Sequence, residues 1–188
     1  MSKSQRGFTL VELLVTISMM AIITSGVFSY SRGNENRNNL IRAQQRLVFE
    51  LRRAQSLAMS NYQNPKDTSG NRCVRWGIEF VLTDGVYDKY SLTSQTCPKG
   101  TESQCDCSVR NKSIDLETIN LPSNISITES DFHGSIYFFP PEPIVEYIDN
   151  YGNERTLDGQ NSLTITIKNK AQESKQVFIN SIGQVIYK

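Results

Sequence analysis

Two segments near the N-terminus decide the fold: residues 8–30 (FTLVELLVTISMMAIITSGVFSY) and residues 39–60 (NLIRAQQRLVFELRRAQSLAMS). In the first segment Glu12 is the one charged residue, and most of the others are apolar. A helix of this length measures roughly 35 Å, which is enough to cross a hydrocarbon core of about 30 Å. The sequence therefore predicts a membrane-spanning helix over residues 8–30.

The second segment has the pattern of an amphipathic helix, which we expect to extend over residues 31–63. Its apolar residues recur at helical spacing, and its charged residues are predicted to lie on the other side. The apolar set is Leu40, Ile41, Leu47, Val48, Leu51, Ala54, Leu57 and Ala58, and the charged set is Arg42, Arg46, Glu50 and Arg53. The two helices are predicted to form one rod of about 80 Å, weakest at Gly33-Asn34 and Asn36–Asn39 and ended by the polar segment Asn61–Gly70.

A cleaved secretory signal peptide is the alternative interpretation of this N-terminus. The apolar run is longer than the h-region of such peptides, and no A-x-A-like cleavage site follows it. The chain continues instead into helix-favouring residues. We therefore expect the apolar helix to stay in the protein.

After Gly70 the pattern changes to short β-rich runs separated by turns, which predicts a head over residues 64–188. Alternation is clearest in Leu163–Ile167, while Asp84-Gly85 and Asn169–Glu173 have the composition of hairpin turns. The predicted strands are 73–82, 86–92, 113–119, 125–128, 135–139, 144–148, 162–168, 175–180 and 184–187. The expected fold class is α+β, with an antiparallel head packed on the second half of the long helix.

Charge is distributed unevenly along the 188 residues. The totals of 20 Lys plus Arg and 19 Asp plus Glu argue against a disordered polyelectrolyte and against a uniformly basic nucleic-acid binder. Residues 32–63 contain six arginines and two glutamates, a net charge of +4. Residues 64–188 contain 12 basic and 16 acidic residues, a net charge of −4. The near-neutral total is therefore the sum of a basic stem, residues 32–63, and an acidic head, residues 64–188.

The first residues match a known signal. Arg6-Gly7-Phe8-Thr9-Leu10-Val11-Glu12-Leu13-Leu14 resembles the type IV prepilin signal. The resemblance implies that residues 1–7 are a cytoplasmic leader, that a membrane peptidase cuts after Gly7, and that Phe8 is N-methylated. It also implies that Glu12 pairs with the terminal ammonium of a neighbouring subunit during assembly. An unpaired charge in such a low-dielectric setting is costly, so this pairing is physically reasonable.

Two further features bear on the subgroup. No proline lies between Phe8 and Asn64, whereas many pilus-forming subunits have a helix-kinking proline there. The helix end at Leu51–Ala58 and the final strand after Gly183 resemble those of H-type pseudopilins and FimT-like minor pilins. These resemblances favour a pseudopilin or minor pilin with a pilin-like fold.

All four cysteines, Cys73, Cys97, Cys105 and Cys107, lie in the head, which we expect outside the cytoplasmic membrane. An even number in an oxidising compartment predicts two disulfides. A Cys105–Cys107 bridge would be strained, so we expect Cys73 to pair with Cys105 or Cys107, and Cys97 with the other. A zinc site is disfavoured because the spacing lacks a C-x2-C pair. These bridges would hold residues 93–112, a polar and strand-poor segment.

We expect neither an enzyme nor a cofactor or metal. The one histidine, His133, lies in a turn-like stretch without a nucleophile motif, and no phosphate-binding, dinucleotide or H-E-x-x-H motif occurs. Residues 149–154 and Asp158-Gly159 contain oxygen ligands that would suit calcium, but their spacing is not that of an EF-hand, and we interpret them as solvated turns.

The expected function is that of a structural subunit of a type IV pilus or a type II secretion pseudopilus. Its expected partners are prepilin peptidase, other pilin or pseudopilin subunits and the inner membrane. We expect a single-pass inner-membrane precursor with its head outside, followed by a periplasmic or cell-surface filament. The alternative is a DNA-binding minor pilin, for which Lys168, Asn169, Lys170 and Lys175 form a small basic patch on an otherwise acidic head.

Overall fold

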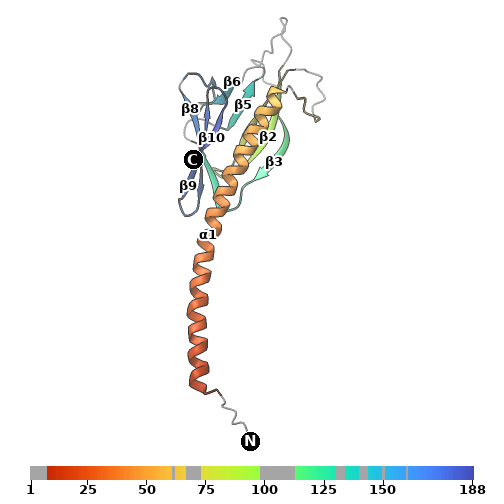
Figure 1. Ribbon diagram of the computed structural model, residues 1–188. Helices are drawn as coiled ribbons and strands as arrows, with labels where there is room; N and C mark the ends of the chain where they lie inside the picture. The colour runs from red at the N-terminus through yellow and green to blue at the C-terminus, as the bar shows by residue number, and fades with distance from the viewer. Residues whose placement is uncertain are drawn as a thin grey trace. The chain divides into compact units, whose positions relative to one another are not determined.

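The computed structural model describes residues 8–60, 62–66, 73–97, 113–129, 134–139, 144–149, 151–159 and 161–188, except the side chains of residues 27–34, 73, 97 and 129. The described residues form one α-helix, α1 (Leu10–Met59), and ten strands (Figure 1). The chain divides into two compact units, Met1–Asn38 and Asn39–Lys188, and each is described by itself.

The strands follow the helix in sequence and pair throughout in antiparallel fashion. They are β1 (Cys73–Thr83), β2 (Val86–Cys97), β3 (Ile114–Asn120), β4 (Ile125–Glu129), β5 (Ser135–Phe139), β6 (Ile144–Ile148), β7 (Glu154–Thr156), β8 (Ser162–Asn169), β9 (Ser174–Asn180) and β10 (Val185–Tyr187). Their order in the sheet is β10, β9, β8, β4, β2, β1, β5, β6 and β7, and β3 pairs with β2 outside this path. The predicted α+β, pilin-like fold with an antiparallel head is confirmed.

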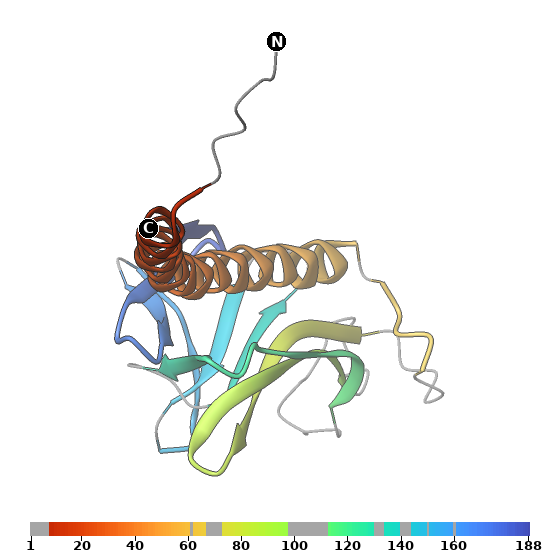
Figure 2. The ribbon, with the colours of Figure 1, turned by 90° about the horizontal axis from the view of Figure 1, so that it is seen from below.

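Residues 39–59 of α1 lie over one face of the sheet (Figure 2). Their apolar side chains join those of the strands in one core, in which Leu47, Leu51 and Trp76 are completely buried. Burying a large apolar side chain contributes about 1.5–3 kcal/mol each. The Trp76 indole N–H donates to the backbone oxygen of Tyr62 at 2.7 Å, so its one polar group is also satisfied.

Strand β1 shows why the two faces of the sheet differ. Trp76, Ile78 and Phe80 alternate toward the helix, whereas Arg75, Gly77 and Glu79 belong to the other face because successive side chains point to opposite sides. A Cβ atom on Gly77 would collide with the backbone oxygen of Ile136 in β5. Glycine at this position therefore permits the close pairing of β1 with β5.

The structure corrects three details of the sequence interpretation. Strand β7 was not predicted, since its three residues are all exposed and show no alternation of apolar and polar residues. Strand β2 extends to Cys97, so residues 93–97 belong to a strand rather than to a strand-poor loop. Glu50, predicted on the solvent side of the helix, is buried because Arg53 supplies a partner at 3.4 Å.

The helical nature of residues 8–30 is confirmed from Leu10 onward, and α1 continues without interruption through Gly33-Asn34 and Asn36–Asn39. Within the residues that the structure describes, no helix meets the length and apolarity needed to cross a membrane. The membrane span predicted for residues 8–30 is thus not found in the described structure.

Candidate assembly site

The start of α1 includes Glu12, one of the residues on which the prepilin resemblance depends. Thr9 precedes the helix, and its side-chain oxygen accepts a hydrogen bond from the backbone N–H of Glu12 at 3.3 Å. Thr9 and Glu12 thus have the spacing of a capping box, S/T-x-x-E, which satisfies backbone groups that a helix start leaves unpaired. Sequence reasoning missed this role of Thr9, although the four-residue pattern was visible in the sequence.

Glu12 is exposed and lies in the first helical turn. A carboxylate there interacts favourably with the positive end of the helix dipole, by about 0.3–1 kcal/mol at an exposed site. Phe8 lies just before the cap, and its side chain is 79% exposed. Gly7, the predicted cleavage position, lies outside the described residues.

Beyond the first turn, the helix displays an apolar surface that its own unit does not cover. Every described side chain from residue 8 to residue 26 is exposed, and the large apolar ones range from 44% exposed at Val15 to 81% at Leu10. Monomeric soluble proteins rarely expose a contiguous apolar patch of this extent. The surface therefore has the character of an interaction site.

Hydroxyl groups on this surface are satisfied within the helix itself. Thr16, Ser18, Thr24 and Ser25 each donate to a backbone oxygen three or four residues earlier, at distances of 2.5 to 2.9 Å. A hydroxyl that is already bonded to its own helix needs no water partner when it is buried. These four residues consequently do not prevent residues 13–26 from entering an apolar environment.

Four of the five described arginine side chains of α1 fall into two groups. Arg52 donates to the backbone oxygen of Val185 at 3.2 Å, and Arg53 contacts Glu117 at 3.0 Å, so both tie the helix to the sheet. The hydrogen bond from Arg53 to Glu117 raises the pKa of Arg53 above its ordinary value. Arg37 and Arg42 are exposed. The basic stem therefore keeps exposed positive charge even after part of it docks on the head.

The head contains a buried polar cluster that the sequence did not predict. The Arg75 side chain is only 2% exposed, and it binds Gln95 Oε1 at 2.6 Å, Glu146 Oε2 at 2.7 Å and Glu154 Oε1 at 2.8 Å. It also lies over the Tyr137 ring at 4.5 Å. Burial raises the pKa of Glu146, although Arg75 acts in the opposite direction. The cluster joins β1, β2, β6 and β7. We interpret its contacts as structural, because they connect these four strands.

Of the predicted basic patch in the last hairpin, Lys168, Asn169 and Lys170 line one pocket, whereas Lys175 belongs to the other face of the sheet. Ile167 pairs with Lys175, and Lys168 pairs with Ser174. Directly paired residues share a face and successive residues alternate, so Lys168 and Lys175 belong to opposite faces. Asn169 is buried, and its amide donates to Glu173 at 2.8 Å. The DNA-binding alternative therefore stays a prediction, with Lys168 and Lys170 as the part of the patch that lies together.

The segment around Asp149, which the sequence predicts to be a solvated turn, contains several hydrogen bonds of its own. Asp149 accepts from the backbone N–H groups of Tyr151 at 2.9 Å and Asn153 at 2.8 Å, and from Arg155 Nε at 3.1 Å. The bond from Asn153 contributes most to lowering the pKa of Asp149 to about 2. No group of three metal-ligating side chains occurs in the described part of the chain. Tyr151 and Gly152 lie in a turn and bend, and Glu154 begins β7; the interpretation without calcium stays a prediction.

The cysteine and histidine predictions concern side chains that the structure does not describe. Strand pairing places Cys73 directly opposite Cys97 in the backbone ladder of β1 and β2. The side chains of these two residues, together with Cys105, Cys107 and His133, lie outside the described residues. The disulfide pairing therefore stays a prediction.

Comparison with known proteins gives one match. Residues 2–28 match a family described as the prokaryotic N-terminal methylation motif. No curated protein and no solved structure matches the chain. The matched residues include Gly7, Phe8, Thr9 and Glu12, so the motif covers the cap, the first turn and most of the exposed apolar surface.

Proposed function

Because the chain has a type IV prepilin-like signal at residues 2–28, we propose that it is a structural subunit of a type IV pilus or a type II secretion pseudopilus. The strongest support is that the matched signal and the exposed apolar part of the helix occupy the same residues. The signal ends in a helix whose described side chains at residues 8–26 are all exposed and mostly apolar. We propose no enzymatic activity for the chain.

Processing is proposed to occur between Gly7 and Phe8. Prepilin peptidase removes residues 1–7 and methylates the new N-terminal amine. Phe8 then lies just before Thr9, the residue that caps α1. The peptidase step therefore removes the leader without cutting into the helix.

Cleavage creates a positive charge on the N-terminal amine of Phe8, which we propose a neighbouring subunit balances. The Phe8 ammonium lies at the N-terminal end of α1, where the helix dipole is also positive. Glu12 of a neighbouring subunit supplies the missing negative charge when the exposed helices pack together. Because an unpaired charge is costly in an apolar setting, this pairing favours one axial offset between neighbours.

We place the precursor in the cytoplasmic membrane with the head, residues 64–188, outside. Lys3 and Arg6 precede the apolar helix and favour a cytoplasmic leader. The proposed partners are prepilin peptidase before assembly and other pilin or pseudopilin subunits afterwards. The proposed final location is a periplasmic or cell-surface filament.

The processing step is tested by Gly7→Ala in the full-length chain, expressed in cells that contain the peptidase. We expect the precursor to accumulate at its uncut size, because the substitution changes the residue at the scissile bond. Ser4→Ala, which changes the leader away from that bond, is the control and should be processed normally. Mature-sized Gly7→Ala protein would contradict the proposed cleavage site.

A DNA-binding minor pilin is the second candidate, and the exposed Arg37 and Arg42 are the observation that favours it. A gel shift of the full-length chain with duplex DNA at several salt concentrations separates the two candidates. The structural-subunit proposal predicts no retardation at low salt. Retardation that weakens steeply with salt would favour the DNA-binding candidate.

A further inference from the structure

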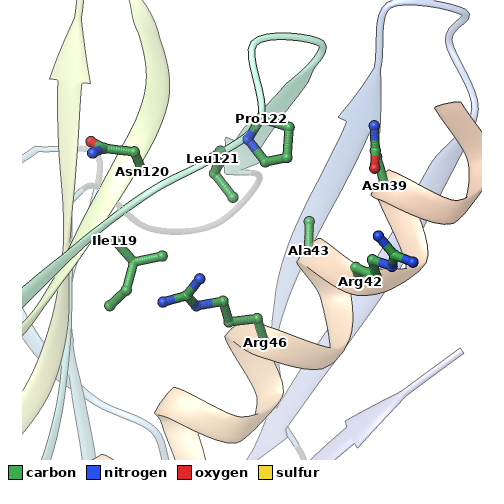
Figure 3. A pocket seen from close by; sticks show the side chains of 8 residues that line it. All are labelled: Asn39, Arg42, Ala43, Arg46, Ile119, Asn120, Leu121 and Pro122. Carbon is green, nitrogen blue, oxygen red and sulfur yellow. The ribbon is translucent and has the colours of Figure 1, made fainter. Parts of the chain in front are cut away.

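A pocket of about 380 Å³ lies between the second half of α1 and the segment that leads from β3 to β4. Figure 3 shows the Arg46 side chain extending from the helix toward Ile119 of β3. Arg42 lines the same pocket one helical turn earlier. The apolar part of the lining consists of Ala43, Ile119, Leu121 and Pro122. We call this site the arginine pocket.

The positive charge of the arginine pocket is only weakly balanced within the chain. The distance from Arg46 to Glu117 is 4.0 Å, and Glu117 makes a closer contact of 3.0 Å with Arg53. The Arg46 side chain is 57% exposed. Arg42 has no acidic partner among the residues that the structure describes. The pocket thus combines the Arg46 guanidinium, which extends over an apolar lining, with the Arg42 guanidinium on the side of Asn39 (Figure 3), and this arrangement suits a carboxylate beside an apolar side chain.

The hairpin between β1 and β2 has the complementary chemistry. Leu82 is 50% exposed and Val86 is 46% exposed, although both are large apolar residues. Asp84 and Asp88 are also exposed, so the hairpin end presents two carboxylates, with Leu82 and Val86 on opposite faces of the hairpin. We call residues 82–88 the acidic tip.

The acidic tip is held in one conformation before any contact is made. Asp84 and Gly85 have φ values of 51° and 79°, and Thr83 pairs with Val86 across the turn. Two positive φ values in succession are typical of the tight turns that match the twist of a hairpin. A preorganised segment loses less conformational entropy when it binds.

We propose that the acidic tip of one copy of this chain docks in the arginine pocket of a second copy. The carboxylates of Asp84 and Asp88 would face Arg42 and Arg46, and Leu82 or Val86 would cover the apolar lining. The head has a net charge of −4 over residues 64–188, and residues 32–63 have +4, so attraction between copies extends beyond the contact itself. The inference rests on the proposed function, because filament assembly brings the copies together.

Tip and pocket adjoin on the same chain, because the backbone N–H of Leu121 donates to the backbone oxygen of Asp88 at 2.8 Å. The tip does not fill the pocket of its own chain, since Leu82 and Val86 stay exposed. Each copy therefore offers one tip and one pocket, and a contact of this kind can repeat along a row of copies. Such a head contact would add specificity to the packing of the apolar helices.

The test uses the full-length chain in cells that assemble it, with the photo-crosslinking residue p-benzoylphenylalanine in place of Asn120. Asn120 is exposed and lines the pocket, so this substitution removes no buried group. We expect a dimer-sized adduct whose crosslinked peptide contains residues 82–88. An adduct to another region of the copy, to a different protein or to nucleic acid would overturn the proposal.

Charge-neutralising variants then test whether tip and pocket act on each other. Arg42→Gln with Arg46→Gln, and separately Asp84→Asn with Asp88→Asn, should each lower the adduct yield about tenfold. Combining all four substitutions should cause little further loss, because each pair removes the same contact. Additive losses would overturn the proposal. Arg37→Gln and Asp158→Asn remove matched exposed charges elsewhere and should leave the yield unchanged.

The same samples distinguish this inference from the proposed function. Filaments of processed chain that give no tip adduct would overturn the tip-to-pocket contact and leave the proposed function intact. Unprocessed chain that never enters a filament would overturn both. Each neutralising variant should also keep the unfolding temperature of the parent chain, which shows that a lost adduct reflects a lost contact.

Discussion

The two halves of α1 have opposite relations to the rest of their own chain. From residue 8 to residue 26 every described side chain is exposed, whereas from residue 40 to residue 58 the apolar positions Leu40, Leu47, Leu51, Ala54 and Ala58 are buried. Both halves are helical and both are rich in apolar residues. The difference teaches that similar apolar helices can have different partners: the second half packs on its own chain, whereas no described part of the chain covers residues 8–26.

The largest expected effect compares the same substitution in the two halves. Leu51→Ala removes a completely buried side chain and should lower the free energy of unfolding by about 2–5 kcal/mol. Leu14→Ala removes a side chain that is 59% exposed and should change it by no more than about 0.5 kcal/mol. Denaturant unfolding of the full-length variants measures both values. Equal losses would show that the first half also packs within its own chain.

The next comparison uses one acidic residue from each half. Glu50→Gln should destabilise the head by about 1–2 kcal/mol, because the carboxylate is buried and loses its charged contact with Arg53. Glu12→Gln should leave the head unchanged and permit processing, but reduce incorporation into sheared filaments about tenfold. Unfolding curves and the filament fraction are measured on both variants. Normal assembly of Glu12→Gln would contradict the charge-pairing account.

The smallest expected effect lies in a region that belongs to neither half of the helix. Hydrogen bonds lower the pKa of Asp149 from its ordinary 3.8 to about 2. The ionised carboxylate therefore stabilises the folded turn fully when the pH is above the pKa of Asp149 in the unfolded chain. This contribution is lost as the pH falls from about 4 toward 2. Amide exchange at Tyr151 and Asn153 should therefore increase in that range, relative to residues of β8.

Asp149→Asn is the matched control for the acid effect, since asparagine keeps one acceptor oxygen but does not titrate. The exchange rates of Tyr151 and Asn153 should then be nearly independent of this pH range once the intrinsic pH dependence of exchange is removed. If Asp149→Asn showed the same steep acid dependence of exchange, a titrating group other than Asp149 would be responsible for it.

Strand positions could be predicted largely because they depend on local patterns. The alternation in Leu163–Ile167 and the turn composition of Asp84-Gly85 correspond to β8 and to the β1–β2 hairpin. Strand β7 lacked such a pattern, because its residues are exposed and its position depends on pairing with β6. Short edge strands are therefore the elements that local reasoning misses.

Buried charges could not be predicted from local sequence. Arg75 lies in a strand whose neighbours are apolar, but its partners Glu146 and Glu154 are 71 and 79 residues away. Glu50 was assigned to the solvent side by helical periodicity and is nevertheless buried. By contrast, the signal around Gly7, Phe8 and Glu12 is contiguous and needs no tertiary contact, so it was recognisable in the sequence and corresponds to the matched motif at residues 2–28.

The most direct test of the account is the mass and N-terminal fragment spectrum of the chain recovered from its cellular filaments. The account predicts a chain that begins at Phe8 and has one additional methyl group on its N-terminal amine. It also predicts that no intact residues 1–7 remain in the assembled fraction. An assembled chain that retains its leader, or one that begins at another residue, would contradict it.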